Sequence, residues 1–315
     1  MNGSVRIRPM AEPDLMAADR AHRLAFGTFF GLPDPAKFRG DAEVVRTRWR
    51  ADAAVCLAAE LDGRVIGSGL GMDWGSVFVV GPVTVDPALW SRGVARQLMD
   101  GLMALIAARP AVTLAALFTH PQSTKHIRLY ESYGFMPQSL IGVFSKPVAA
   151  ASAAAPAFSL YSHLSAADQE GALAACRALA AANYPGLDLT REIRAVAMQR
   201  LGDTLLLTDG GGISGFAICH YGAGSEGGSG RCFVKFAAVR PGAAAAFTRL
   251  VDACDMLAAS VGAGRLIAGV NSGRRAAYRL LQGRGYRADM NGLAMHRPDA
   301  PGYDRPDMFV IDDWR

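Results

Sequence analysis

The sequence repeats one order of expected elements twice, and this repeat limits the chain to two similar halves. Each half begins with a strand-like segment and a helical stretch and continues with a hairpin pattern. Strand, helix, strand and helix then follow, ending in a Gly-aromatic pair. Matched landmarks, such as Asp62-Gly63 and Asp209-Gly210, lie about 150 residues apart. A shared offset of this kind indicates an internal duplication.

Strands and helices alternate within each half, which is typical of mixed α/β folds. We therefore expect an α/β chain (α+β sandwich) of two consecutive domains, each with its own mixed central sheet flanked by helices. The run Val148–Ala157 is Ala-rich, uncharged and contains a proline, as interdomain linkers often do. It separates predicted domains over residues 1–148 and 157–315. A chain of 315 residues, 51% of them hydrophobic, is sufficient for two ordinary cores.

The charge pattern argues against nucleic acid or a membrane surface as partner. The sequence has 33 Lys+Arg and 28 Asp+Glu, a formal net charge of +5 that is divided between the two halves. Five cysteines form an odd set without a CxxC pair or zinc-type His spacing, so we expect reduced, buried thiols and no metal. The first residues lack the apolar core of a signal peptide. Together these features favour a cytoplasmic protein.

A candidate anion site follows the apolar strand predicted over Ser76–Val85. From Gly93 onward the apolar residues recur at helical spacing, so the turn places a helix N-terminus beyond the strand end. Free backbone N–H groups and the helix dipole favour a phosphate there, and Gly93 lets the backbone approach an anion closely. Arg92 and Arg96 would add charge-assisted bonds. The same residues also fit an ordinary strand-to-helix turn.

A second segment, His120–Phe135, has a polar strand end and a helix closed by glycine. Together the two segments resemble the GNAT superfamily of acyl-CoA-dependent N-acetyltransferases. That family's phosphate-loop pattern, Gln/Arg-x-x-Gly-x-Gly/Ala, is matched by Trp90–Ala95, with Trp90 in place of the polar residue. Its Tyr-x-x-x-Gly-Phe pattern is matched by Tyr130–Phe135. The resemblance extends over the element order of the whole first half.

The resemblance implies acetyl-CoA as cofactor and assigns roles to residues of the first half. Main-chain groups of Thr84 and Val85 would pair with the pantetheine arm, and Ser123 would contact the same arm. Tyr130 would be the general acid that protonates the departing thiolate. The pyrophosphate would be held by the loop residues Arg92, Gly93, Val94, Ala95 and Arg96.

The general base is less well specified by the sequence. No carboxylate occurs within Ser76–Val85, where many family members have a Glu. His120 and Asp73 are the candidates, although a lone histidine such as His120 is often a structural residue. An amine that arrives neutral, or that loses its proton to water, would need no base at all.

The segment between the first helix and the hairpin is the candidate acceptor pocket. Phe26 and Phe30 would contact an apolar amine, and Asp34 would meet its positive charge. The alternative for such an aromatic cluster is ordinary core at a helix end.

The second half has lost the residues that carry the chemistry in the first. In the loop after Val239, the residue that corresponds to Gly93 is no longer a glycine. Leu281 stands at the position of Tyr130. Tyr278, one helical turn away, is the alternative acid. The second half is thus expected to keep the fold without the cofactor. The final segment Asp307–Arg315 is predicted to dock as a strand or to line the acceptor site.

These observations together predict an enzyme, a tandem-domain acetyltransferase that moves acetyl from acetyl-CoA to a primary amine of a small molecule by direct attack. The alternative is a non-catalytic acyl-CoA-binding sensor. A homodimer is compatible with the sequence.

Overall fold

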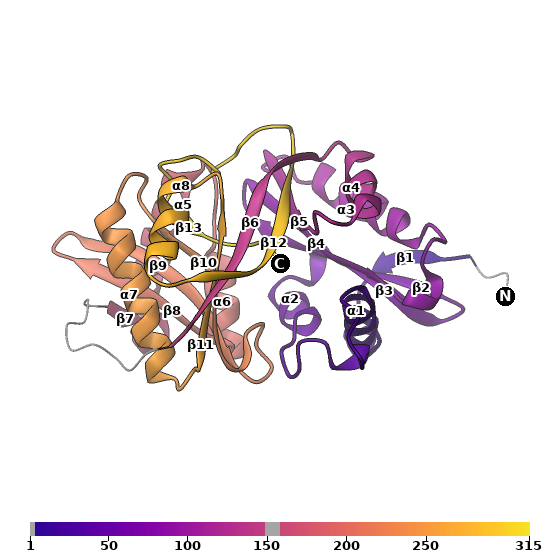
Figure 1. Cartoon of the computed structure of the whole chain (residues 1–315), viewed down its shortest axis with the longest axis horizontal. Coiled ribbons are helices and arrows are strands. Elements are labelled where there is room, and N and C mark those ends of the chain that lie inside the picture. The colour runs from indigo at the N-terminus through magenta and orange to yellow at the C-terminus, as the bar shows by residue number, and fades with distance from the viewer. Residues whose placement is uncertain (1–3, 149–157) are drawn as a thin grey trace.

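The computed structural model describes residues 4–148 and 158–315, and it confirms a mixed α/β fold (Figure 1). The predicted linker, Val148 apart, lies outside these residues. The elements of the first half are β1 (Arg6–Pro9), α1 (Leu15–Phe29), α2 (Val45–Ala51), β2 (Cys56–Leu61), β3 (Arg64–Trp74), β4 (Val77–Val85), α3 (Val94–Ala107), β5 (Leu114–Thr119), α4 (Thr124–Glu131) and β6 (Met136–Pro147).

The second half repeats this order and adds a short last strand. Its elements are β7 (Phe158–Leu160), α5 (Ala166–Asn183), α6 (Thr190–Gln199), β8 (Gly202–Asp209), β9 (Gly212–Gly222), β10 (Gly228–Val239), α7 (Ala244–Ser260), β11 (Arg265–Asn271), α8 (Arg275–Gly283), β12 (Arg287–Arg297) and β13 (Val310–Ile311). The second helix of each half, α2 and α6, was not expected, because both are short, with 7 and 10 residues.

The two halves share one 13-stranded sheet, whereas we expected a separate sheet in each half. The exchange involves the last long strand of each half. β6 pairs with β11 and β12, and β12 pairs with β5. These two strands run side by side through the middle of Figure 1. Either strand can supply the hydrogen bonds that either edge requires, so the sequence pattern alone does not specify the partner.

Apolar packing also joins the halves. Trp74 at the end of β3 packs edge-to-face against Phe236 of β10, with ring centroids 5.7 Å apart. Both side chains are almost completely buried in a core that contains residues of both halves. The first half therefore cannot form its complete core without the second. Of the helices described, none is long and apolar enough to cross a membrane.

Candidate active site

An open strand edge in the first half forms the floor of the site. β4 and β5 pair in parallel from Val77 to Val80, but β4 stays paired with β3 as far as Val85. The two parallel strands therefore separate beyond Val80. A bulge at this point includes Gly81, whose φ of 133° is readily adopted only by glycine. The separation leaves residues 81–85 without a strand partner on the β5 side.

The loop after β4 has the form of an anion-binding turn. Gly93 precedes α3 with a φ of 78°, a left-handed conformation that suits glycine, and its missing side chain leaves open space. The first amide groups of α3, from Val94 to Arg96, have no carbonyl partner within the helix. Trp90, which departs from the family pattern, donates its indole N–H to the carbonyl oxygen of Val85 at 2.8 Å. It therefore fixes the loop to the strand end.

A cavity of about 800 Å³ joins the open strand edge, the loop and α4. The wall of this cavity includes eleven of the residues that the sequence singles out: Phe26, Phe30, Thr84, Val85, Gly93, Val94, Ala95, Arg96, His120, Ser123 and Tyr130. Three others, Arg92, Asp34 and Asp73, lie outside it. Arg92 is solvent-exposed in the loop, and the exposed Asp34 caps the turn Pro35–Lys37 and pairs with Lys37 at 3.4 Å. The expected cation partner is thus not in the cavity, because capping keeps Asp34 at the surface.

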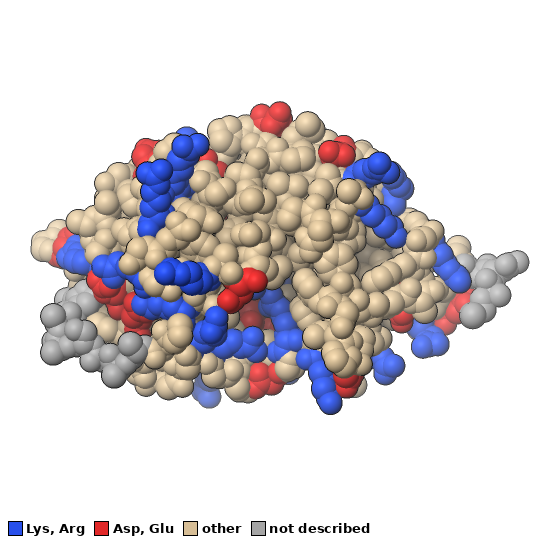
Figure 2. Space-filling model, viewed as in Figure 1, with Lys and Arg blue, Asp and Glu red and all other residues tan. Residues whose placement is uncertain are grey.

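The cavity wall is basic. Within the described parts of the chain its lining contains no Asp or Glu, whereas Arg96, Lys125 and Arg128 lie near the loop and α4. None of these three cations has an ion pair within residues 4–148 or 158–315. Lys125 donates only to the hydroxyl of Ser91, at 3.1 Å. Over the face drawn in Figure 2, by contrast, basic and acidic side chains are interspersed. The positive charge of the cavity is therefore a local feature.

Tyr130 lines the cavity and has an uncommitted hydroxyl. It lies on α4, its ring packs edge-to-face against Phe135 with centroids 6.5 Å apart, and the hydroxyl has no hydrogen-bond partner among the residues described. Burial raises the pKa of Tyr130 to about 12. The phenol therefore keeps its proton at neutral pH and can donate it.

His120 follows the end of β5 and is surrounded by aromatic rings. Its ring centroid lies 4.9 Å from that of Phe29 and 5.1 Å from that of Phe30. Burial, assisted by the neighbouring His126, lowers the pKa of His120 to about 4. Its buried Nδ1 has no hydrogen-bond partner in the described structure. His120 is therefore neutral at physiological pH with an available ring nitrogen.

Asp73, the other candidate base, lies elsewhere. Its carboxylate accepts from Arg109 at 3.2 Å and from the backbone N–H of Gly75 at 3.0 Å, and it does not line the cavity. The structure therefore leaves His120 as the candidate base.

The acceptor end of the cavity has an aromatic wall completed by the second half. Phe38 stacks on Phe26 and on Phe30, with centroid distances of 5.5 Å and 5.7 Å. Phe29, which lies in the predicted pocket segment, is also part of the wall, and wall residues that sequence reasoning missed are His22, Arg39, Phe118, His126 and Met290. Trp314 and Arg315 also line this end. Of the two roles left open for Asp307–Arg315, docking as a strand is confirmed by β13, whereas a part in acceptor binding stays a prediction.

The corresponding edge in the second half is filled by the chain itself. β10 and β11 pair as far as Val234, while β10 continues to Val239, as β4 does in the first half. Here β13 pairs with Ala237 and Ala238, and Val239 donates its N–H to the carbonyl of Phe309. Leu281, at the position of Tyr130, is fully buried. Within residues 158–315, this half thus has no open strand edge comparable to that beside β4.

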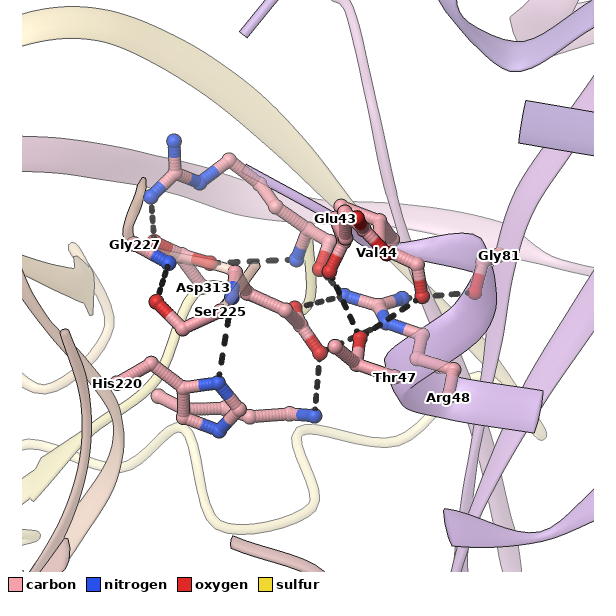
Figure 3. Close-up of polar contacts among 12 residues, drawn as sticks. Glu43, Val44, Thr47, Arg48, Gly81, His220, Ser225, Gly227 and Asp313 are labelled. Carbon is pink, nitrogen blue, oxygen red and sulfur yellow. Dashed lines mark hydrogen bonds and ion pairs between the residues drawn. The ribbon is translucent and has the colours of Figure 1, made fainter. Parts of the chain in front are cut away.

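A buried polar cluster connects the site to the second half (Figure 3). Arg48 of α2 donates to the carbonyl oxygen of Gly81 at 2.9 Å and to the carboxylate of Glu226 at 2.9 Å. Lys235 also donates to Glu226, at 2.7 Å. Burial alone would raise the pKa of Glu226, but the two cations hold it well below the usual value. The bulged strand is therefore anchored through Arg48 to a charged residue of the second half.

We expect three buried histidines to make the protein acid-sensitive. Burial lowers the pKa of His22 to about 3, and those of His120 and His220 to about 4. These imidazoles bind protons more readily in the unfolded chain than in the folded one. Their contribution to the free energy of unfolding is therefore complete above about pH 6.5 and declines as the pH falls towards the pKa of the folded state. For His22 the loss is about 2 kcal/mol between pH 7 and pH 5.

Urea unfolding of the wild type and a His22→Phe variant at both pH values measures this loss. The variant should show a smaller difference in unfolding free energy between the two pH values. An equal difference would contradict the role of His22.

Comparisons with known proteins agree with this geometry. Residues 20–135 match the acetyltransferase (GNAT) family. Similar solved structures include a candidate acetyltransferase from Pyrococcus horikoshii, with a TM-score of 0.68 and 14% sequence identity. The match covers 98% of this chain and 95% of that one. A GCN5-related N-acetyltransferase from Sphaerobacter thermophilus gives a TM-score of 0.61 at 20% identity, covering 95% and 96% of the two chains. No curated protein matches the sequence. Residues 20–135 thus match a GNAT acetyltransferase domain, and the chain as a whole shares the fold of these solved acetyltransferase structures.

Proposed function

We propose that the protein is an N-acetyltransferase that transfers acetyl from acetyl-CoA to a primary amine of a small molecule by direct attack in a ternary complex. The observation that carries this proposal is the continuous cavity described above. It connects the open edge of β4 and the loop at Gly93 with the hydroxyl of Tyr130 and the aromatic acceptor end. A cofactor arm and an acceptor amine can meet in a cavity of this form.

The residues present fit acetyl-CoA. Amide groups of Val94 to Arg96, together with Arg96, Lys125 and Arg128, would hold its phosphates. The unpaired backbone at Thr84 and Val85 would receive the pantetheine arm. Ser123, whose side chain makes no capping bond to α4, is free to contact the same arm. Acetyl-CoA supplies an activated acyl group as a thioester.

The side chains at the junction provide proton donation and proton acceptance. The amine nitrogen forms a bond to the acyl carbon, the carbon–sulfur bond breaks, and the amine loses one proton. Tyr130 keeps its proton at neutral pH and can donate it to the leaving thiolate. His120 is neutral and can accept the proton from the amine nitrogen as the new bond forms. The apolar rings around His120 exclude bulk water from this transfer.

Isothermal titration tests the cofactor site. We expect one acetyl-CoA per chain, because β13 occupies the corresponding edge of the second half. A Gly93→Glu variant should abolish binding, since its carboxylate would lie in the anion site. Gly93→Ala imposes the same left-handed backbone strain without the charge and should retain most of the affinity. Ala244→Glu, in the matching loop of the second half, should bind normally. Two equivalent sites per chain would contradict the proposal.

An acceptor screen tests catalysis. Thiol release from acetyl-CoA is measured with a panel of small primary amines, and release that depends on one amine class supports the enzyme. Binding of acetyl-CoA with no release against any amine would instead support the acyl-CoA sensor.

A further inference from the structure

Arg39 is a partly buried cation without a counterion at the acceptor end of the cavity. It follows Phe38 in the connection between α1 and α2, and its guanidinium lies 5.9 Å from the centre of the Phe38 ring. No hydrogen bond or ion pair from its side chain occurs within residues 4–148 and 158–315. Its φ of 63° is left-handed, a conformation that costs a non-glycine residue about 1 kcal/mol or more. Strain of this kind is commonly stored at ligand sites.

The deeply buried cations differ from the partly buried Arg39 because each of them has a carboxylate partner. Arg48 and Lys235 share Glu226, and Arg274 lies between Asp304 and Asp312 at 2.7 Å from each. Burial and the nearby Arg315 lower the pKa of Arg39 to about 10, so it stays charged at neutral pH. A buried charge without a partner is unfavourable. An anionic ligand would remove this cost.

Arg315 provides a second free donor at the same end of the cavity. Its terminal nitrogen pairs with Asp313 at 2.8 Å, and its guanidinium lies 5.2 Å from the centre of the Phe233 ring. Its buried Nε has no hydrogen-bond partner in the described structure. The guanidinium of Arg39 and the Nε of Arg315 therefore lack hydrogen-bond partners within the described residues, at a wall whose described lining contains no Asp or Glu.

We propose that the acceptor is an amine that also carries a carboxylate, which Arg39 and Arg315 bind while the amine faces His120. This inference rests on the proposed function and narrows its substrate class. Guanidinium groups match the planar geometry of a carboxylate. The rings of Phe38, Phe30 and His120 connect the two ends at centroid spacings under 6 Å, so a small molecule can span them. A polyamine, by contrast, would bring further positive charge into a basic cavity.

The test compares amino carboxylates of increasing length, from glycine to 6-aminohexanoate, with their neutral amides. We expect kcat/KM to favour at least one carboxylate over its amide by about 10- to 100-fold, the range expected for hydrogen bonds to a charged group. Arg39→Gln should remove this preference, and Arg39→Lys should retain part of it. Arg64→Gln, at an exposed arginine of the β2–β3 hairpin, is the matched control and should change nothing.

Binding measurements separate this inference from the proposed function. Each amino carboxylate is titrated into the protein saturated with CoA, with and without the Arg39→Gln change. Carboxylate binding that depends on Arg39 without acetyl transfer would support this inference while contradicting the enzymatic proposal. Equal kcat/KM values for the amides and the carboxylates would overturn the inference. A preference for the carboxylate that persists in Arg39→Gln would also overturn it. Unchanged acetyl-CoA affinity in Arg39→Gln shows that the variant has folded.

Discussion

Replacing Tyr130 with phenylalanine is expected to lower kcat by about 100-fold or more, within the usual range for removing a general acid. The affinity for acetyl-CoA should stay within about twofold, because the ring and its contact with Phe135 remain. The expectation follows from two properties of the hydroxyl. It belongs to a residue that lines the cavity and has no hydrogen-bond partner in the described structure, and burial raises its pKa to about 12. Steady-state kinetics and isothermal titration measure the two effects.

The matched control for this change lies in the second half. Tyr278→Phe also removes a phenolic hydroxyl, from a ring that packs against Phe144 with centroids 4.9 Å apart. It lies on α8, the counterpart of α4, and was the alternative acid in the sequence analysis. The kcat of the Tyr278→Phe variant should equal that of the wild type. An unchanged kcat in Tyr130→Phe would remove Tyr130 from the mechanism, and a loss restricted to Tyr278→Phe would place the chemistry in the second half.

The features that could be predicted from the sequence are those determined by residues close together in the chain. The glycine loop at Gly93 requires only the strand before it and the helix after it. Tyr130 requires only the helix on which it lies and the turn that ends this helix. Comparing the two halves was sufficient to find that Leu281 replaces Tyr130, and the structure places Leu281 in the core.

Features that depend on distant segments could not be predicted in this way. β6 and β12 both read as ordinary last strands, and only the packing of the whole sheet determines which edge each one joins. Asp73 is a candidate base by its charge and position, but its hydrogen bond from Arg109, 36 residues further along the chain, holds it outside the cavity. Arg39 gave no sequence signal, since its environment is completed by residues near 315.

The same long-range contacts lead to the second large effect, on stability. Replacing Arg48 with methionine is expected to lower the free energy of unfolding by about 3 kcal/mol, the lower end of the usual cost of breaking a buried ion pair, because Lys235 still pairs with Glu226. Arg48 and Glu226 are each only 1% exposed in their side chains. The change would also leave the carbonyl of Gly81 without its hydrogen bond from Arg48, at the bulge beside the site.

Urea unfolding measures this cost, with Arg194→Met as the matched control. Arg194 and Glu170 form an exposed pair at 3.0 Å, and solvent screens such pairs, so the control should change stability by about 1 kcal/mol or less. Because Glu226 belongs to the second half, a large loss in Arg48→Met would mean that this half stabilises the bulged strand of the active half. A loss no greater than that of Arg194→Met would contradict this role, and the second half would then act on the site only through the residues that line the cavity.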